Sequence, residues 1–404
     1  MKIRSLPYLI WLISALFYMY EFIHRISISI IIEELVKEFS FNSYDISNIS
    51  AVYFFSYAMF QIPAGIIVDR FGINIVYKSA MLVALGCFIF SQSHNIISIK
   101  IARIIIGIGS AFSFISCLKI IILYFKNKKH ISILIGITNC LGITGALIGG
   151  APFAKLVDIL GWRDSIFFLF IVSFFFGVIL FFVTTDVNMK NTKINLNFYK
   201  NSLLVLIKSK QNWFIAIFGS LMISPIIVLS ELWGTQFLLV KYDFNKEFGS
   251  FLSSLTFLGI GIGGIVNGYI SYLLKTERPV LLYGNLGSFI CVLLIIYLNF
   301  SIPILIILHF LFGFFTSSML LCFTLAIKKS PKHLHGTVIG FLNTIIMTGS
   351  VFFQPLTGYL LNNNLQEYHF KKVFIILPIC LIISFIIQYF IEETNDIKYD
   401  KSSC

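Results

Sequence analysis

The stretch from Ser165 to Val183 reads SIFFLFIVSFFFGVILFFV and contains no charged residue. It is long enough to cross the hydrocarbon core of a bilayer as a helix. A strand of a membrane β-barrel would instead alternate apolar and polar residues. Since lipid offers no hydrogen bonds to the backbone, a helix, which satisfies its own, is the structure that this run predicts.

Similar runs recur along the whole chain, which has 404 residues, 58% of them hydrophobic and only 12% charged. A soluble domain carries about twice that charged fraction. We place spans at 8–32, 47–68, 74–92, 96–123, 131–153, 165–184, 212–236, 248–271, 279–298, 302–326, 335–360 and 372–391. The first run is too long for the apolar part of a cleaved signal peptide, so we interpret it as an uncleaved span.

The positive charges predict the orientation of these twelve helices. With the N-terminus in the cytoplasm, 19 of the 30 Lys and Arg residues fall in cytoplasmic segments and eight fall outside. Cytoplasmic loops carry such an excess, so we expect both termini in the cytoplasm. The net charge of +12 therefore reflects topology, and we expect no nucleic-acid partner. The polar, lysine-rich stretch 186–211 is predicted to link an N-terminal six-helix bundle (1–185) to a C-terminal one (212–404).

An internal repeat supports two similar halves. Gly136, Asn139 and Gly145 recur as Gly340, Asn343 and Gly349, each at an offset of 204 residues. Arg103 and Gly107 recur as His309 and Gly313, at an offset of 206 residues. Duplicated halves are typical of transporters that bind their substrate at the interface between the repeats.

Several motifs resemble those of the major facilitator superfamily. They are Gly65-Ile-Ile-Val-Asp69-Arg70-Phe-Gly72, Arg103-Ile-Ile-Ile-Gly107-Ile-Gly109, the run from Gly142 through Gly145 and Gly149 to Pro152, and Gly161-Trp162-Arg163. The resemblance implies an all-α integral membrane protein with twelve transmembrane helices. We expect a multi-pass monomer in a bacterial inner membrane. The first span, with Glu21-Phe-Ile-His24-Arg25, resembles a bacterial branch related to the lysosomal dipeptide transporter group. The second half departs from the pattern, because Tyr272 stands where an Asp would be expected.

The resemblance also implies which residues control the change between inward- and outward-facing states. The turn residues could form a latch in one state, since an Asp can cap a helix N-terminus and pair with a cation; equally, they could simply set topology. The glycines of the fifth span allow close helix packing. The predicted gating residues are Gly65, Asp69, Arg70, Gly72, Gly145, Gly149 and Pro152.

Charged residues inside spans are the candidates for substrate binding and coupling, because each costs at least ~2.5 kcal/mol to insert. Glu21 and Arg25 lie one turn apart with Tyr18 on the same face, either as a self-neutralising pair or facing the central cavity. Arg103 begins a stripe with Gly107, Ser110 and Phe114. In the second half, Glu231 and His309 are candidates, although Glu231 could lie at the interface and His309 could be a core residue.

The predicted function is secondary active transport of a small polar organic solute by alternating access. An amino acid or short peptide is the first candidate because arginine binds carboxylates and Glu21 or Glu231 could bind an amine or a coupled proton, as in symport. Organic anions, sugar phosphates, an uncoupled facilitator and a non-transporting receptor are the alternatives. The six internal cysteines lack metal-ligand spacing, and neither paired catalytic residues nor a Walker loop occurs. We therefore expect no enzyme activity, metal or cofactor.

Overall fold

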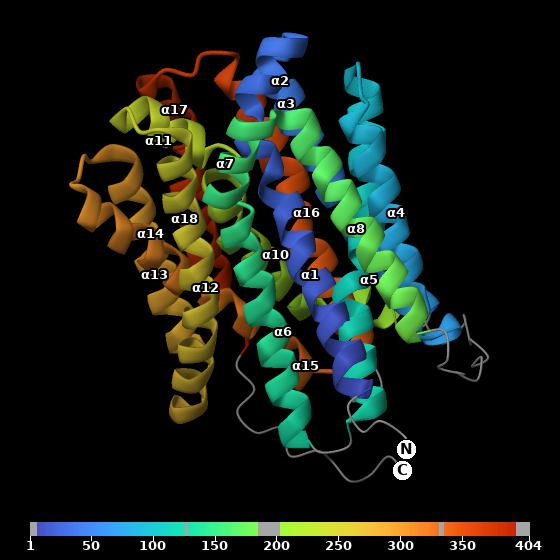
Figure 1. Cartoon of the computed structure of the whole chain (residues 1–404). Coiled ribbons are helices and arrows are strands. Elements are labelled where there is room, and N and C mark those ends of the chain that lie inside the picture. Colours follow the sequence, from blue (N-terminus) through green and yellow to red (C-terminus); the bar gives the residue numbers. More distant parts are fainter. Residues whose placement is uncertain (1–5, 126–127, 185–202, 331–334, 393–404) are drawn as a thin grey trace.

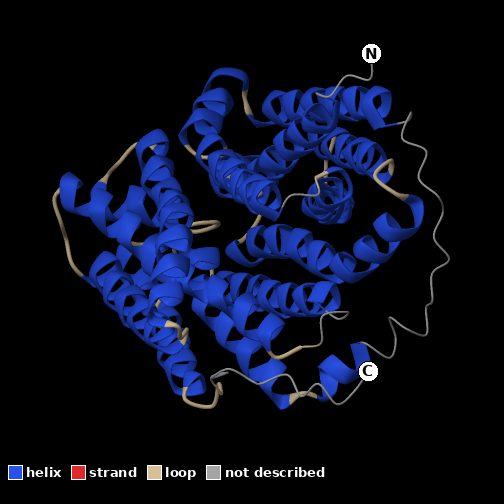
Figure 2. Cartoon of the chain, turned by 90° about the horizontal axis from the view of Figure 1, so that it is seen from below, coloured by secondary structure: helices blue, strands red, loops and turns tan. Residues whose placement is uncertain are grey.

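The computed structural model describes residues 6–125, 128–184, 203–330 and 335–392. Long helices run side by side (Figure 1), and the described residues form helices and loops without strands (Figure 2). The first half, here residues 6–184, comprises α1 (Leu6–Ile30), α2 (Ile32–Phe39), α3 (Ser43–Phe71), α4 (Ile75–Ser91), α5 (Ile96–Tyr124), α6 (Lys128–Ile148), α7 (Ala151–Leu160) and α8 (Trp162–Thr184).

The second half, here residues 203–392, has the corresponding order of helices. These are α10 (Lys210–Leu229), α11 (Gly234–Tyr242), α12 (Lys246–Leu274), α13 (Arg278–Tyr297), α14 (Ile302–Thr316), the 3₁₀ helix η1 (Ser317–Leu320), α15 (Leu321–Lys328), α16 (His335–Leu361), α17 (Glu367–Val373) and α18 (Ile376–Gln388). We call the end where α1 begins the terminal side and the end with α2 and α11 the far side (Figure 1).

The twelve predicted spans are present as helices. Eleven helical segments are long and apolar enough to cross a membrane. The remaining one is α4, an apolar helix of 17 residues that packs against α5 and α8. The predicted all-α membrane fold is therefore confirmed. The division at 185 and 212 stays a prediction, and much of the predicted linker, residues 185–202, lies outside the described residues.

Several spans are interrupted rather than continuous. The predicted first span ends where the short helix α2 begins, with Ile31 between them. The fifth span breaks at Gly149 and Gly150, where Pro152 occupies the first turn of α7. The seventh breaks between Leu229 and Gly234. Such interruptions need buried surroundings in a membrane, because the freed backbone groups must find other partners.

The glycine repeat packs helices in the same way in both halves. Gly142, Gly145 and Gly149 bring α6 against α1, where a side chain on Gly145 would collide with the Met19 carbonyl. In the second half, Gly349 brings α16 against α10 at Ser220 and Ser224. The fifth and eleventh spans thus pack on the first and seventh through small residues, as membrane helices commonly do.

Long helices of the two halves pack against each other in two main places. The pair α3 and α16 lies in contact along its length, from Ser43 near Gly358 to Ile62 near Gly340. At the other place, α6 and α7 both lie against α12, with Gly150 beside Ser254. Of the residues described next, Glu21 and Arg25 lie on α1, Glu231 lies in the break after α10, and Arg103 and His309 lie on α5 and α14.

Candidate functional site

The site begins where α1 and α5 pack face to face. The Ser110 hydroxyl donates a hydrogen bond to the Glu21 carboxylate. One turn away, the rings of Tyr18 and Phe114 lie 5.0 Å apart. The predicted stripe on α5 therefore contacts the predicted stripe on α1. Glu21 is only 2% exposed, and its Oε1 has no hydrogen-bond partner among the described groups.

Arg25 does not form an ion pair with Glu21. Its guanidinium carbon lies 4.5 Å from the centre of the Phe22 ring and 4.9 Å from that of Tyr57. The residue is 9% exposed, and its charge interacts electrostatically with Glu21 and Glu231. In the described part of the chain, no carboxylate oxygen comes within 4 Å of it. A buried guanidinium held by aromatic faces keeps its forked donors available for an anion.

Arg103 is held differently. Its Nη1 donates to the His24 carbonyl at 2.7 Å, its Nε donates to the Ile49 carbonyl at 3.4 Å, and its guanidinium carbon lies 4.5 Å from the centre of the Tyr53 ring. It is fully buried. These contacts connect α5 to α1 and α3, so Arg103 positions helices, although its Nη2 has no partner among the described groups.

The second half contributes Glu231 and His309. Glu231 lies in the break between α10 and α11 and is 5% exposed, and its side chain forms no hydrogen bond or ion pair with a described residue. Its charge reaches Arg25 across the interface. His309 is fully buried in α14, and neither ring nitrogen has a described partner. It interacts electrostatically with Lys241 rather than with the charges on α1.

Tyr53 and Tyr57 of α3 belong to this site but were not among the predicted residues. Their rings are stacked 6.2 Å apart, and each faces one of the two buried arginines. The available signal was their spacing of four residues, which places both on one face of the second span. Neither tyrosine is charged, so the rule that selects charged residues inside spans does not include them.

The predicted gating turn lies on the terminal side. Gly72 ends α3 with a φ of 75°, a conformation that glycine adopts without strain. Arg70 is exposed, with its guanidinium carbon 5.0 Å from the centre of the Phe71 ring. The side chain of Asp69 lies outside the described residues, and Gly65 has open space around it. The latch therefore stays a prediction.

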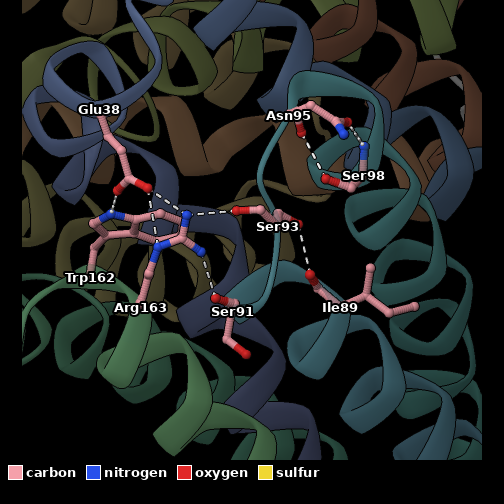
Figure 3. Close-up of polar contacts among 8 residues, drawn as sticks. All are labelled: Glu38, Ile89, Ser91, Ser93, Asn95, Ser98, Trp162 and Arg163. Atoms are coloured by element: carbon pink, nitrogen blue, oxygen red, sulfur yellow. Dashed lines mark hydrogen bonds and ion pairs between the residues drawn. The ribbon is translucent and has the colours of Figure 1, made fainter.

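On the far side, α2 is fixed firmly to the first half (Figure 3). The Trp162 indole and the Arg163 guanidinium both donate to Glu38, at 2.8 and 2.5 Å. Arg163 also donates to the carbonyls of Ser91, the last residue of α4, and Ser93, just after it. Burial tends to raise the pKa of Glu38, but these donors outweigh it and hold the pKa below its usual value.

The same helix also contacts the second half. Lys246 of α12 donates to Glu34 and lies 3.8 Å from Asp158. The Gln236 amide of α11 donates to Glu33 at 3.1 Å. Nearby, the Trp233 indole donates to Ser47 at 3.2 Å. Helix α2 therefore bridges the two halves and closes them against each other on the far side.

Comparison with known proteins agrees with this architecture. The sequence matches the family described as Major Facilitator Superfamily over residues 10–271 and 212–402. The chain belongs to the major facilitator superfamily. It is therefore a membrane transporter, as its motifs predict, and not an enzyme; the closer resemblance to one bacterial branch stays a prediction.

Individual relatives are distant. An uncharacterized protein of Campylobacter jejuni is 28% identical over 237 residues, 56% of this chain and 70% of the relative. The hexuronate transporter of Bacillus subtilis is 22% identical over 284 residues, 66% of this chain and 65% of the relative. A solved bacterial homolog of the human lysosomal transporter Spinster, in an inward-facing and unoccupied conformation, superposes with a TM-score of 0.77 at 13% identity, covering 97% of both chains.

Proposed function

We propose that this transporter moves a small organic solute with a carboxylate group, and that Arg25 binds the carboxylate. The observation that carries the proposal is the buried guanidinium of Arg25, which lies between Phe22 and Tyr57 and has no carboxylate partner among the described residues. A buried charge without a counterion costs several kcal/mol, and an anionic substrate would compensate that cost. Glu21 and Glu231 within electrostatic reach suit an amine on the same solute. Amino acids and short peptides are therefore the first substrate class.

Organic anions without an amine are the second candidate. The hexuronate transporter of Bacillus subtilis carries sugar acids by its name, which favours a related carboxylate here. Both classes use the same arginine, so they differ in what the acidic residues do. With an amino acid or peptide, one of the protein's acidic residues binds the amine of the substrate. With a sugar acid, which has no amine, that residue stays free for the coupling ion.

We further propose that Glu21 carries a coupled proton and that the structure represents an inward-facing state. The Glu21 carboxylate is buried and held by Ser110, so it can exchange a proton when access alternates. The contacts of α2 close the far side. If the terminal side is cytoplasmic, as the positive charges predict, the closed far side is external.

Uptake by reconstituted vesicles tests these proposals. The panel comprises amino acids, dipeptides and hexuronates, each with and without an imposed pH gradient. Arg25→Gln is expected to abolish uptake. Arg25→Lys keeps the positive charge but loses the forked pair of guanidinium donors. It should therefore raise KM about ten-fold or more, which corresponds to a loss of about 1.4 kcal/mol or more of binding free energy. Equal uptake by wild type and Arg25→Gln would refute the carboxylate site. A gradient effect unchanged in Glu21→Gln would refute its role as proton carrier.

A further inference from the structure

The break in the seventh span leaves backbone groups without partners. The amides of Ser230 and Glu231 both donate to the Ile226 carbonyl, and that of Trp233 donates to the Val228 carbonyl. The bonds of Glu231 and Trp233 reach back five residues, whereas those of an α-helix reach back four. As a result, no described group donates to the carbonyls of the break, which are those of Leu229, Ser230, Glu231 and Leu232. Gly234 is needed here, because a side chain would collide with the Leu229 carbonyl.

Two buried side chains without partners lie at the same break. The side chain of Glu231, within it, makes no hydrogen bond or ion pair with a described residue, and its Oε2 is fully enclosed. Ser253 of α12 is 3% exposed, and its Oγ has no described partner. That Oγ lies 3.0 Å from the position a side chain on Gly234 would occupy, so it points at the start of α11.

We propose that the break between α10 and α11 is a sodium site, formed by Glu231, carbonyls of the break and the Ser253 hydroxyl. Carboxylate, carbonyl and hydroxyl oxygens suit hard cations, and unwound carbonyls at half-helix ends coordinate coupling ions in other transporters. A proton would neutralise Glu231 but leave the carbonyls unsatisfied. A divalent ion is disfavoured, because the single carboxylate stands within electrostatic reach of Arg25.

Arg25 would link this site to the substrate. Its positive charge acts on Glu231 without a direct ion pair, so it weakens cation binding without blocking an oxygen. This step rests on the proposed function. A substrate carboxylate on Arg25 would cancel the repulsion and tighten sodium binding, and sodium would tighten substrate binding by the same factor. The sodium site itself is independent of the substrate.

The site can be tested on the purified full-length protein in detergent. Thermal unfolding is followed while sodium chloride replaces choline chloride at constant ionic strength, with potassium chloride as a second reference. The expected result is a saturable rise of Tm with sodium alone, because a ligand that binds the folded state stabilises it. Glu231→Gln and Ser253→Ala should weaken the apparent sodium affinity about ten-fold or more.

Ser254→Ala is the matched control. It removes a hydroxyl from the next residue of α12, but the Ser254 Oγ donates to the Ser250 carbonyl and faces Gly150. Its sodium response should equal that of wild type. The same Tm in sodium, potassium and choline, or an unchanged sodium response in Glu231→Gln, would overturn the proposal. If Glu231→Gln does not fold, the test is direct binding of radioactive sodium to wild type and to Ser253→Ala. No binding to wild type, or equal affinity in the two proteins, would then overturn the proposal. If uptake depends on Arg25 but the protein binds no sodium, the sodium site is refuted and the proposed function stands.

Discussion

Replacing Lys246 by glutamine is expected to loosen the closed far side. Lys246 donates to Glu34 on α2, which is itself fixed to the first half through Glu38 and Arg163. The lysine side chain is 11% exposed and the Glu34 side chain 25%, so the pair is only partly screened by solvent. Removing the ammonium therefore weakens a charged contact that, in this state, holds the halves together.

The size of the effect follows from this burial. A hydrogen bond to a charged group contributes about 1.5–3 kcal/mol, whereas an exposed ion pair contributes at most about 1 kcal/mol. For this partly exposed pair we expect about 1–2 kcal/mol. If the contact is absent when the far side opens, the ratio of closed to open molecules should fall roughly 5–30-fold.

Distances between spin labels measure this ratio directly. One label replaces His94 in the loop after α4, and the other replaces Gln366 just before α17. Both positions are exposed on the far side, one in each half. A background without the exposed Cys140 and without Cys404, which lies outside the described residues, reduces stray labelling. The Lys246→Gln variant should shift the population toward longer distances between the labels. The charge-swapped double variant, Glu34→Lys with Lys246→Glu, should restore the distances of wild type. An unchanged distribution in Lys246→Gln, or no recovery in the exchange, would refute the reasoning.

Three further predictions concern stability and its pH dependence. Arg103→Gln should lower the free energy of unfolding by about 3 kcal/mol, because Arg103 bonds to carbonyls of α1 and α3. The KM for substrate should stay unchanged. An unchanged Tm with a raised KM would instead place Arg103 in the substrate cavity. Gly145→Val should destabilise the protein by about 1–3 kcal/mol or more. Gly136→Ala, at a position with open space around it, should stabilise it by about 0.5–1 kcal/mol. The same Tm for the two variants would contradict both expectations. Since the pKa of Glu38 is lower in the folded protein, its stabilising contribution is complete above about pH 4.3 and is lost as the pH falls through the folded pKa. Tm measured against pH should therefore fall more steeply in wild type than in Glu38→Gln, and the exposed Glu247→Gln should follow wild type.

The packing of α1 on α5 shows how far the sequence could predict the site. Tyr18 and Glu21 on one helix, and Ser110 and Phe114 on the other, were predicted as stripes from helical spacing alone, and they meet across the interface. The break at Glu231 could not be predicted in this way. The polar residues from Ser230 to Gln236 also fit the outer end of a span, where Glu231 could lie at the interface. Pro225, the usual signal of a break, lies inside α10.

The sequence by itself determined that this protein is a membrane transporter with twelve helices in a repeated order, because the length of an apolar run and the placement of lysines depend on lipid and not on neighbouring helices. Only the tertiary structure decided what the buried charges do. Arg25 and Arg103 look alike in the sequence. Yet Arg25 lies beside two aromatic rings with no counterion in the described part of the chain, whereas Arg103 is bonded to backbone carbonyls. The physical reason is that the partners of a buried charge come from helices far away in the sequence, and helical periodicity fixes the face of a residue but not what lies opposite it.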